Sequence, residues 1–356
     1  MPSIEGGGVE KNFFIIANFF SKKINNLSII STSISNKKKF SKNIELIFPK
    51  SLFWEKSSRR IKYFICLFLL IKTIIFDKNL TVFAFQANLY CILVCKIFKI
   101  NIITRSNSSP SGWSKNFFKI NIYKFFLQKA DAVMVNSFEF KKQMKQIFGV
   151  NTTCIYNPLN RDDIISLSKK KKKNIFGKKK SLKIINIGRF VEQKDQETLI
   201  KALDLLKDKV NFEARIIGKG KLKNKLNNLI DECNLKNKIK LLNFTDNPFK
   251  YLVQTDIFIL TSIYEGLPNV LLEALSLKKF VISSDCPTGP KEILLNGNGG
   301  LIFKTGNYLK LSKKILYYVQ NKNECRKMLK KSFSSLKRFD KKTNLEKYYN
   351  FVKKYI

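Results

Sequence analysis

Short apolar runs alternate with helical stretches along the second half of the chain. The runs are residues 182–187, 211–217, 238–243, 257–260 and 279–284. Each has the length of a buried strand and is too short for most helices. The stretches between them carry apolar residues at helical spacing, and a helix from about Pro290 and two basic helices follow. This regular alternation predicts a parallel, doubly wound sheet.

The first half of the chain repeats this alternation in a weaker form. Its strand-like runs are Leu27–Ser31, Glu45–Phe48, Leu80–Phe85, Ile102–Thr104, Ala132–Val135 and Thr153–Tyr156. The helical stretches Arg59–Phe76 and Leu89–Phe98 are strongly apolar, but the longest apolar run, Tyr63–Ile71, has only nine residues. A spanning helix needs about 20. We therefore expect packed helices here and not membrane anchors.

Two lysine runs divide the halves. Lys169–Lys173 and Lys178–Lys180 resist burial and are typical of a linker. We therefore predict a first domain over 1–160, a Lys-rich linker over 161–180, a second domain over 181–335 and a C-terminal helix over 336–356. This last helix could cross back to the first domain. The predicted fold class is α/β, with two Rossmann-like domains facing a central cleft.

The charge of the chain limits the kinds of partner that it has. The net charge is +41, from 67 Lys and Arg against 26 Asp and Glu. This excess favours an anionic partner, namely a phosphorylated ligand, an acidic membrane face or nucleic acid. The seven Cys residues are scattered and there is no His, which argues against a zinc site and a disulfide framework and fits a reducing cytoplasm. Acid–base catalysis by His is excluded.

The stretch Asp256–Ala274 predicts a strand, a turn and a helix with Pro268 in its first turn. The turn and the helix N-terminus present backbone N–H groups, which suit a phosphate. Glu265 in the turn and Glu273 on the helix suit the hydroxyls of a ligand. A ligand with hydroxyls at both ends and a phosphate between them is a nucleotide sugar. In the alternative interpretation, both carboxylates are solvated surface charges.

Further candidate residues follow two other predicted strands. Arg189 and Lys194 come after strand 182–187 and could converge on one diphosphate, although a solvated loop pair is the alternative. Gly218 and Gly220 let a backbone approach a ligand closely, but a lone G-x-G is a weak signal.

Together these motifs resemble the retaining glycosyltransferases of family 4, which have the GT-B fold. The resemblance covers roughly residues 181–303, through the segments 187–194, 217–220, 264–269 and Glu273-Ala274. The first half is similar more loosely, at Glu5–Glu10, Asn136-Ser137 and Asn157-Pro158. The segment 284–292 resembles members that build surface polysaccharides or glycans on lipid carriers.

The resemblance implies that the domain over 1–160 binds the acceptor and that the domain over 181–335 binds the nucleotide sugar. It also implies a role for each matched residue. Arg189 and Lys194 would hold the donor diphosphate, Glu265 would contact the donor sugar, and Glu273 would bind the ribose. Leu267 and Asn269 would offer backbone N–H groups. The donor-binding set would be Gly188, Gly218, Gly220, Gly266, Leu267, Asn269 and Glu273. The family needs no metal ion and no cofactor, and the chain has no D-x-D motif.

The resemblance also implies a reaction. It would move a hexose or N-acetylhexosamine, with retention of configuration, from a nucleotide sugar to a lipid-linked or polysaccharide acceptor. We expect UDP as the nucleotide, because it is the commonest one in such donors. The basic excess and the apolar helices with interspersed lysines in the first half favour binding to an anionic membrane surface without insertion, and we expect the protein at the inner face of the cytoplasmic membrane. Many members place a His in the first-half loop, and Asn107 or Ser106 would stand there in this chain. Gly7, Gly8 and Asn107 are the acceptor-side candidates.

Three rival interpretations fit parts of the sequence. A GT-B sugar-nucleotide epimerase would use acid–base residues, including His, that this chain lacks. A nucleic-acid-binding protein fits the charge, but no aromatic–basic stacking motif or recognition helix is present. An inactive partner subunit conflicts with the intact Arg189, Lys194, Glu265 and Glu273.

The glycine loop at the start of the chain follows an unusually short segment. In a doubly wound domain such a loop turns from the end of the first strand into a helix. Here Gly6-Gly7-Gly8 follows only five residues, and Pro2 disfavours a central strand there. A sheet without that strand has unpaired backbone and a hole in its core. We therefore expect that the natural protein carries about six to ten further residues upstream, which form the strand.

Overall fold

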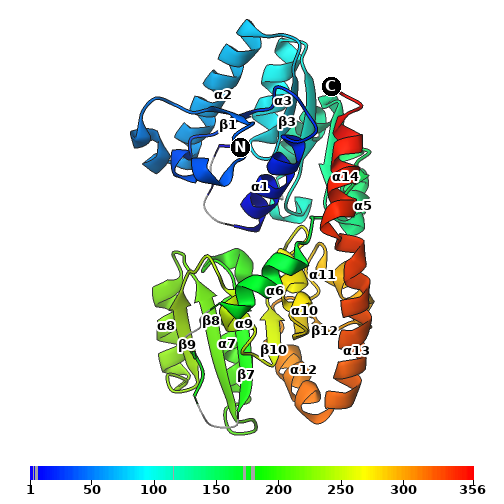
Figure 1. Cartoon of the computed structure of the whole chain (residues 1–356). Coiled ribbons are helices and arrows are strands. Elements are labelled where there is room, and N and C mark those ends of the chain that lie inside the picture. The colour runs from blue at the N-terminus through cyan, green and yellow to red at the C-terminus, as the bar shows by residue number, and fades with distance from the viewer. Residues whose placement is uncertain (3, 5–6, 115, 171–173, 178–180) are drawn as a thin grey trace. The chain divides into compact units, whose positions relative to one another are not determined.

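The computed structural model describes residues 1–356 except 3, 5–6, 115, 171–173 and 178–180. The chain divides into two compact units (Figure 1). The first contains Met1–Pro158 and Lys341–Ile356, and the second contains Leu159–Asp340. Gly6 and Glu5 of the predicted glycine loop, and most of the two lysine runs, lie outside the described residues.

The first unit contains two parallel sheets. The strands β3 (Thr81–Ala84), β4 (Asn101–Arg105), β5 (Ala132–Val135) and β6 (Thr153–Cys154) form one sheet in that order, and β1 (Ser28–Ile30) pairs with β2 (Glu45–Ile47) in the other. The backbone of Met1 and Pro2 hydrogen-bonds to Ile30 and Thr32 beside β1. All of these pairs are parallel, as the alternation in the sequence predicted.

Helices cover both faces of the four-stranded sheet of the first unit. They are α1 (Gly8–Phe20), α2 (Arg59–Phe76), α3 (Asn88–Ile97), α4 (Phe117–Lys129), α5 (Phe138–Phe148) and α14 (Lys341–Val352). Because side chains alternate along a strand, the neighbours Ile102 and Ile103 on β4 enter different hydrophobic clusters. One cluster joins the sheet to α1 and α14, and the other joins it to α2, α3, α4 and α5.

The second unit is a six-stranded parallel sheet with the order β12-β11-β10-β7-β8-β9. The strands are β7 (Leu182–Ile187), β8 (Phe212–Gly218), β9 (Ile239–Asn243), β10 (Ile257–Leu260), β11 (Phe280–Ser284) and β12 (Leu301–Phe303). The helices are α6 (Arg161–Lys169), α7 (Gln196–Asp204), α8 (Lys223–Glu232), α9 (Phe249–Leu252), α10 (Asn269–Ser276), α11 (Pro290–Ile293), α12 (Tyr308–Gln320) and α13 (Lys322–Ser335). The α/β class with parallel sheets is confirmed.

Three details of the sequence-based prediction were wrong. Residues 161–169, assigned to the linker, form α6, because Asn160 caps the helix and Ile164 and Ser168 bury one face of it. Strand β12 was missed, because its apolar run has only three residues and directly follows a glycine pair. The basic C-terminal stretch forms α12, α13 and α14, where two helices were expected.

Helix α14 is fixed to the first unit through a buried arginine at the end of β4. Arg105 is 1% exposed, and its Nε donates to the Tyr348 hydroxyl over 2.9 Å. Its other nitrogens donate to the side-chain oxygens of Asn157 and Asn107. The Tyr348 hydroxyl in turn donates to the carbonyl of Ile155 over 3.2 Å. Within the described part of the chain this guanidinium has no carboxylate partner, so neutral oxygens replace its lost hydration.

This network gives a test of how strongly α14 holds the first unit. Replacing Tyr348 by Phe leaves a buried charged donor without its acceptor, which should lower the free energy of unfolding by about 1–3 kcal/mol. Thermal unfolding of the whole chain measures it. Tyr349→Phe is the matched control, because the exposed hydroxyl of Tyr349 makes only a 3.5 Å contact to the carbonyl of Lys23. Equal melting temperatures of the two variants would contradict the role of Arg105.

Candidate functional site

The candidate site lies at the carboxyl edge of the six-stranded sheet. Strands β7 and β10 are hydrogen-bonded neighbours, so the loops that follow them emerge side by side. The Ile263 N–H donates to the carbonyl of Gln193, and the Gln193 side-chain amide donates to the carbonyl of Tyr264, both over 2.8 Å. The Thr261 hydroxyl donates to the carbonyl of Lys194 over 2.8 Å. These bonds lock the two loops together.

An ion pair joins the two loops at their centre. Lys194 Nζ lies 2.5 Å from Glu265 Oε1, and the two side chains are 16% and 10% exposed. The Ser262 hydroxyl donates to the same carboxylate oxygen over 2.6 Å. The backbone of Glu265 is also held, because its N–H donates to the carbonyl of Pro287. The structure therefore brings together two of the residues that the sequence analysis selected, a cation and a carboxylate, in a fixed geometry.

Arg189 lies on the same loop as Lys194 but has a different environment. Its side chain is exposed, and its Nη2 donates to the Gln193 side-chain oxygen over 3.4 Å. Its carbonyl accepts a bond from the amide of Gln196. A planar, exposed guanidinium presents donors that suit a phosphate. The convergence of Arg189 and Lys194 on one diphosphate stays a prediction.

The glycines of this region allow two loops to pack backbone against backbone. A side-chain carbon added to Gly218 would lie 2.0 Å from the carbonyl oxygen of Gly188. One added to Gly220, whose φ is +154°, would lie 2.3 Å from the carbonyl oxygen of Phe190. At Gly188 itself the nearest atoms belong to the Lys194 side chain, at 3.4 Å. The packing of the neighbouring loop therefore requires glycine at positions 218 and 220, independently of any ligand.

The turn before α10 carries the remaining donor-binding candidates. Gly266 is buried and its carbonyl accepts a bond from the Thr288 hydroxyl over 2.8 Å. Leu267 is buried as well, and Asn269 is the first residue of α10. Pro268 is the N-cap residue of this helix, so its predicted place in the first turn was one residue too far along.

Both candidate carboxylates of this turn and helix are buried. Counted over the whole residue, Glu265 is 7% exposed and Glu273, the fifth residue of α10, is 8% exposed. The alternative in which they are solvated surface charges is therefore wrong. Glutamate is rarely buried unless it is paired or hydrogen-bonded. Two buried glutamates after one strand therefore indicate that this region supplies hydrogen-bond or ion-pair partners for carboxylates.

The acceptor-side candidates lie in the first unit. Gly7 is the N-cap residue of α1 and Gly8 is its first residue. The Asn107 amide donates to the carbonyls of Phe85 and Arg105, and its oxygen accepts from Arg105, so its side chain already supports the strand ends. The Ser106 hydroxyl is buried and has no partner in the described part of the chain. A role for Gly7, Gly8 or Asn107 toward an acceptor stays a prediction.

Sequence reasoning missed residues whose hydrogen bonds support the loops and the carboxylate of the site. Gln193 and Ser262 connect the loops and the carboxylate, as described above, and Thr288 fastens Gly266. Ser262 lies two residues beyond β10, at the edge where ligands bind in parallel sheets. That position was the available signal for it. Gln193 lies inside the quoted motif but was given no role.

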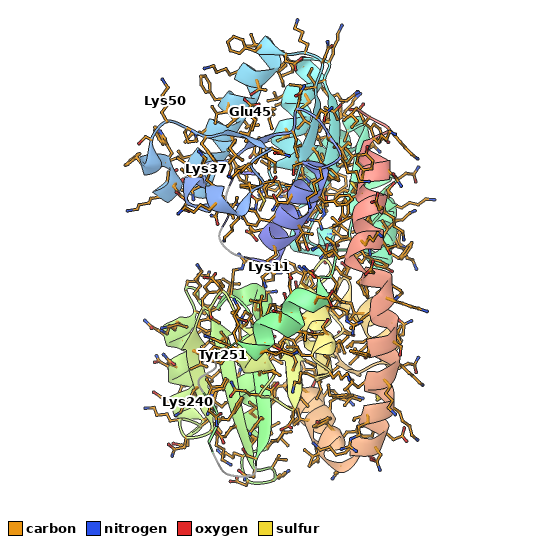
Figure 2. All side chains as sticks on the ribbon, viewed as in Figure 1. Lys11, Lys37, Glu45, Lys50, Lys240 and Tyr251 are labelled. Atoms are coloured by element: carbon orange, nitrogen blue, oxygen red, sulfur yellow. The ribbon has the colours of Figure 1, made fainter. Side chains whose placement is uncertain are left out.

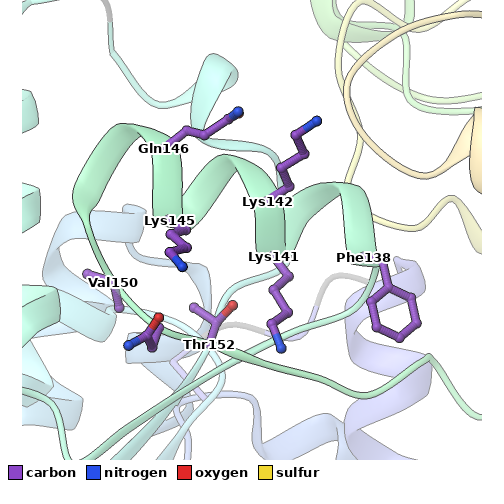
Figure 3. Close-up of a pocket in the computed structure, with 8 residues that line it drawn as sticks. Phe138, Lys141, Lys142, Lys145, Gln146, Val150 and Thr152 are labelled. Atoms are coloured by element: carbon purple, nitrogen blue, oxygen red, sulfur yellow. The ribbon is translucent and has the colours of Figure 1, made fainter.

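A pocket of about 390 Å³ lies elsewhere, along α5 in the first unit (Figure 3). Phe138, Lys141, Lys142, Lys145 and Gln146 of α5 and residues 150–152 line it. None of the predicted site residues is among them. No group of three His, Cys, Asp or Glu side chains among the described residues is arranged to hold a metal ion.

Comparison with known proteins matches the second unit to a family. The profile of the glycosyl transferases group 1 matches residues 168–334. Residues 168–334 are therefore similar to the glycosyltransferase domains of this group. This glycosyltransferase domain contains the Lys194–Glu265 pair and every donor-binding candidate. Assignment to the retaining family 4 stays a prediction.

Curated relatives extend the match without covering whole proteins. An uncharacterized glycosyltransferase of Methanocaldococcus jannaschii is 42% identical in an alignment of 219 residues that covers 57% of this chain and 53% of that protein. A second relative, from Campylobacter jejuni, is the N-acetylgalactosamine-N,N'-diacetylbacillosaminyl-diphospho-undecaprenol 4-alpha-N-acetylgalactosaminyltransferase. It is 30% identical in an alignment of 225 residues that covers 61% of this chain and 60% of that protein. The chain thus spans only about half to three-fifths of the length of these relatives.

A solved structure shows the fold of the whole chain. The Anabaena protein HepE in complex with UDP-glucose aligns with a TM-score of 0.78 and 17% identity, covering 99% of this chain and 98% of that one. The similarity shows the GT-B fold, as the sequence motifs predicted.

The contact between the two glycine loops of the glycosyltransferase domain can be tested by adding one methyl group. In Gly218→Ala the methyl carbon meets the Gly188 carbonyl at 2.0 Å, so we expect a loss of about 1–3 kcal/mol or more in stability. Gly306→Ala is the control: its methyl group meets no atom within 4 Å, and only the positive φ of +74° costs about 1–2 kcal/mol. Thermal unfolding compares them. A Gly218→Ala variant at least as stable as Gly306→Ala would contradict the close loop packing.

Proposed function

We propose that this protein transfers a hexose or N-acetylhexosamine from a UDP-linked sugar to a lipid-linked or polysaccharide acceptor in surface-glycan biosynthesis. The observation that carries the proposal is the Lys194–Glu265 pair, held across the ends of adjacent strands in a glycosyltransferase domain. A cation suits a diphosphate and a buried carboxylate suits sugar hydroxyls. The pair therefore fits the junction between the sugar and the diphosphate of the donor.

The relatives support the choice of substrates. The Campylobacter jejuni relative is named for a diphospho-undecaprenol substrate, and the HepE structure contains UDP-glucose. A lipid-linked acceptor and a UDP donor are therefore the substrates that we propose for this chain. The cytoplasmic membrane, at its inner face, is the proposed place of the reaction. No described helix is long and apolar enough to cross a membrane.

In the proposed reaction, the bond between the anomeric carbon and the diphosphate oxygen breaks. The acceptor oxygen bonds to that carbon on the same face, which retains its configuration, and the acceptor proton passes to the leaving diphosphate. Negative charge grows on the diphosphate as the bond breaks, and Lys194 and Arg189 are the cations of the loop that would stabilise it. Glu265 would orient the sugar and Glu273 the ribose, and this scheme needs no metal ion.

The first experiment screens nucleotide sugars for thermal stabilisation of the protein. A ligand at 100 times its dissociation constant should add roughly 2.7 kcal/mol to the stability. We expect stabilisation by a UDP sugar, and turnover of that sugar in the presence of a polyprenyl-diphosphate-linked glycan and of EDTA. Absence of stabilisation by every nucleotide sugar, together with salt-sensitive binding of an oligonucleotide, would favour the nucleic-acid alternative.

Substitution of the two cations tests the leaving-group role. Donors aimed at developing charge are typically worth about 3–4 kcal/mol, so Arg189→Ala and Lys194→Ala should each lower kcat by about 100- to 1000-fold. Arg189 is exposed, so its variant should also keep the melting temperature of the native protein. The control is Lys201→Ala, which removes a surface partner of Glu197 and should leave kcat unchanged. Near-normal turnover in either variant would remove that residue from the mechanism.

A further inference from the structure

Three neighbouring helices of the first unit expose large apolar side chains to solvent. On α2 these include Phe64, Phe68 and Ile75, which lie at helical spacing opposite the buried Cys66 and Ile74. Phe64 is 73% exposed. Both faces of this helix are therefore apolar, and only one of them has a partner inside the unit. A helix that is apolar all round belongs in a core or at a membrane.

The same pattern continues on α3 and α4. Leu93 and Ile97 are exposed on α3, and Phe118, Ile122 and Phe125 are exposed on α4, with Phe118 at 76%. The buried sides of α2, α3 and α4 contribute to one hydrophobic cluster, so their exposed sides point away from the same core. Helix α2 packs on α3, where the Tyr63 and Tyr90 rings lie 6.2 Å apart, and α3 packs on α4. These exposed side chains therefore belong to one surface, which we call the outer face.

The charge of the outer face has a single sign. The sequence of the three helices contains eight Lys or Arg residues, four on α2, one on α3 and three on α4, and no Asp or Glu. Lys62 is buried and Lys96 pairs with Asp131 over 2.7 Å, whereas the other six cations are exposed. Several cations lie beside aromatic rings of these helices: Lys129 is 5.7 Å from the ring centre of Phe125, and Lys72 is 6.0 Å from that of Phe76. A lysine or arginine can bury its carbon chain along apolar surface while its charge stays at a polar boundary.

We propose that the outer face of α2, α3 and α4 docks on an anionic lipid bilayer, with its aromatic rings in the interfacial layer and its cations among the headgroups. Apolar side chains that enter the headgroup boundary, together with cations that meet anionic lipids, are how surface-lying helices bind. This inference rests on the membrane location proposed above and assigns it a docking face. Its test does not require the transferase reaction, so the two can fail separately.

The charge also decides against a second copy of the chain as the occupant. A two-fold symmetric dimer places the same surface on both sides of the interface. The six exposed cations of these helices would then face the same six cations, without an acidic residue from these helices to pair with them. Like charges that meet across an interface oppose association. An anionic surface has the complementary charge.

The test is co-sedimentation of the whole protein with vesicles of phosphatidylglycerol and phosphatidylcholine, or of phosphatidylcholine alone. We expect at least tenfold stronger binding to the anionic vesicles, reduced by high salt. Replacing Phe118 and Phe125 together by Ser should weaken binding at least tenfold, because two buried rings are lost from the interface. Lys119→Gln with Lys124→Gln should weaken binding to the anionic vesicles by about tenfold or more and leave binding to phosphatidylcholine unchanged.

Matched controls come from α12 of the second unit. Leu309→Ser removes a side chain that is 53% exposed, and Lys310→Gln with Lys313→Gln removes two exposed cations. Neither should change vesicle binding. The α4 side chains are exposed, so all variants should keep the native melting temperature and the nucleotide-sugar stabilisation. Vesicle binding that is equal for both lipid mixtures, or unchanged in the α4 variants, would overturn the proposal, as would self-association through α4 without vesicle binding.

Discussion

The parallel pairing of β7 with both of its neighbours is the constraint on which the second unit depends. Ile184 of β7 is in register with Ala214 of β8 and with Ile257 of β10, and all three side chains enter the same hydrophobic cluster. A slip by one residue would turn each strand's apolar side chains to the wrong face. Because that register is fixed, the loops after β7, β8 and β10 leave the sheet at one edge. The ion pair and the glycine contacts follow from it.

The architecture was largely predictable from the sequence, because a buried parallel sheet needs continuous apolar strands. Those strands alternate with amphipathic helices at regular intervals, and this local pattern can be recognised without any knowledge of contacts. Short elements without such a pattern were not predictable: β12 has three residues, and α6 merges into a lysine run. The predicted number of C-terminal helices was also wrong, because the lysine-rich sequence contains no clear signal for the ends of α12 and α13.

The site was predictable as a set of residues but not as a geometry. Lys194 and Glu265 were both selected, yet only the pairing of β7 with β10 shows that they neutralise each other. Composition likewise could not separate buried cations from surface ones. Lysines such as Lys37, Lys50 and Lys240 are exposed (Figure 2). Arg105, in contrast, is buried and donates to neutral oxygens. Burial of a single charge depends on contacts between residues that are hundreds of positions apart, as Arg105 and Tyr348 are.

The contribution of α14 to the first unit has a consequence for the order in which the chain folds on the ribosome. The second unit is continuous in sequence, so all of its strands have been synthesised before Tyr348 is added. The first unit, although it is made first, lacks Leu345, Tyr348 and Val352 of its core until the last segment emerges. Domains usually fold in the order of their synthesis. In this protein the second unit can finish folding before the first, and a nascent chain that ends at residue 340 has one folded unit and one with an open core.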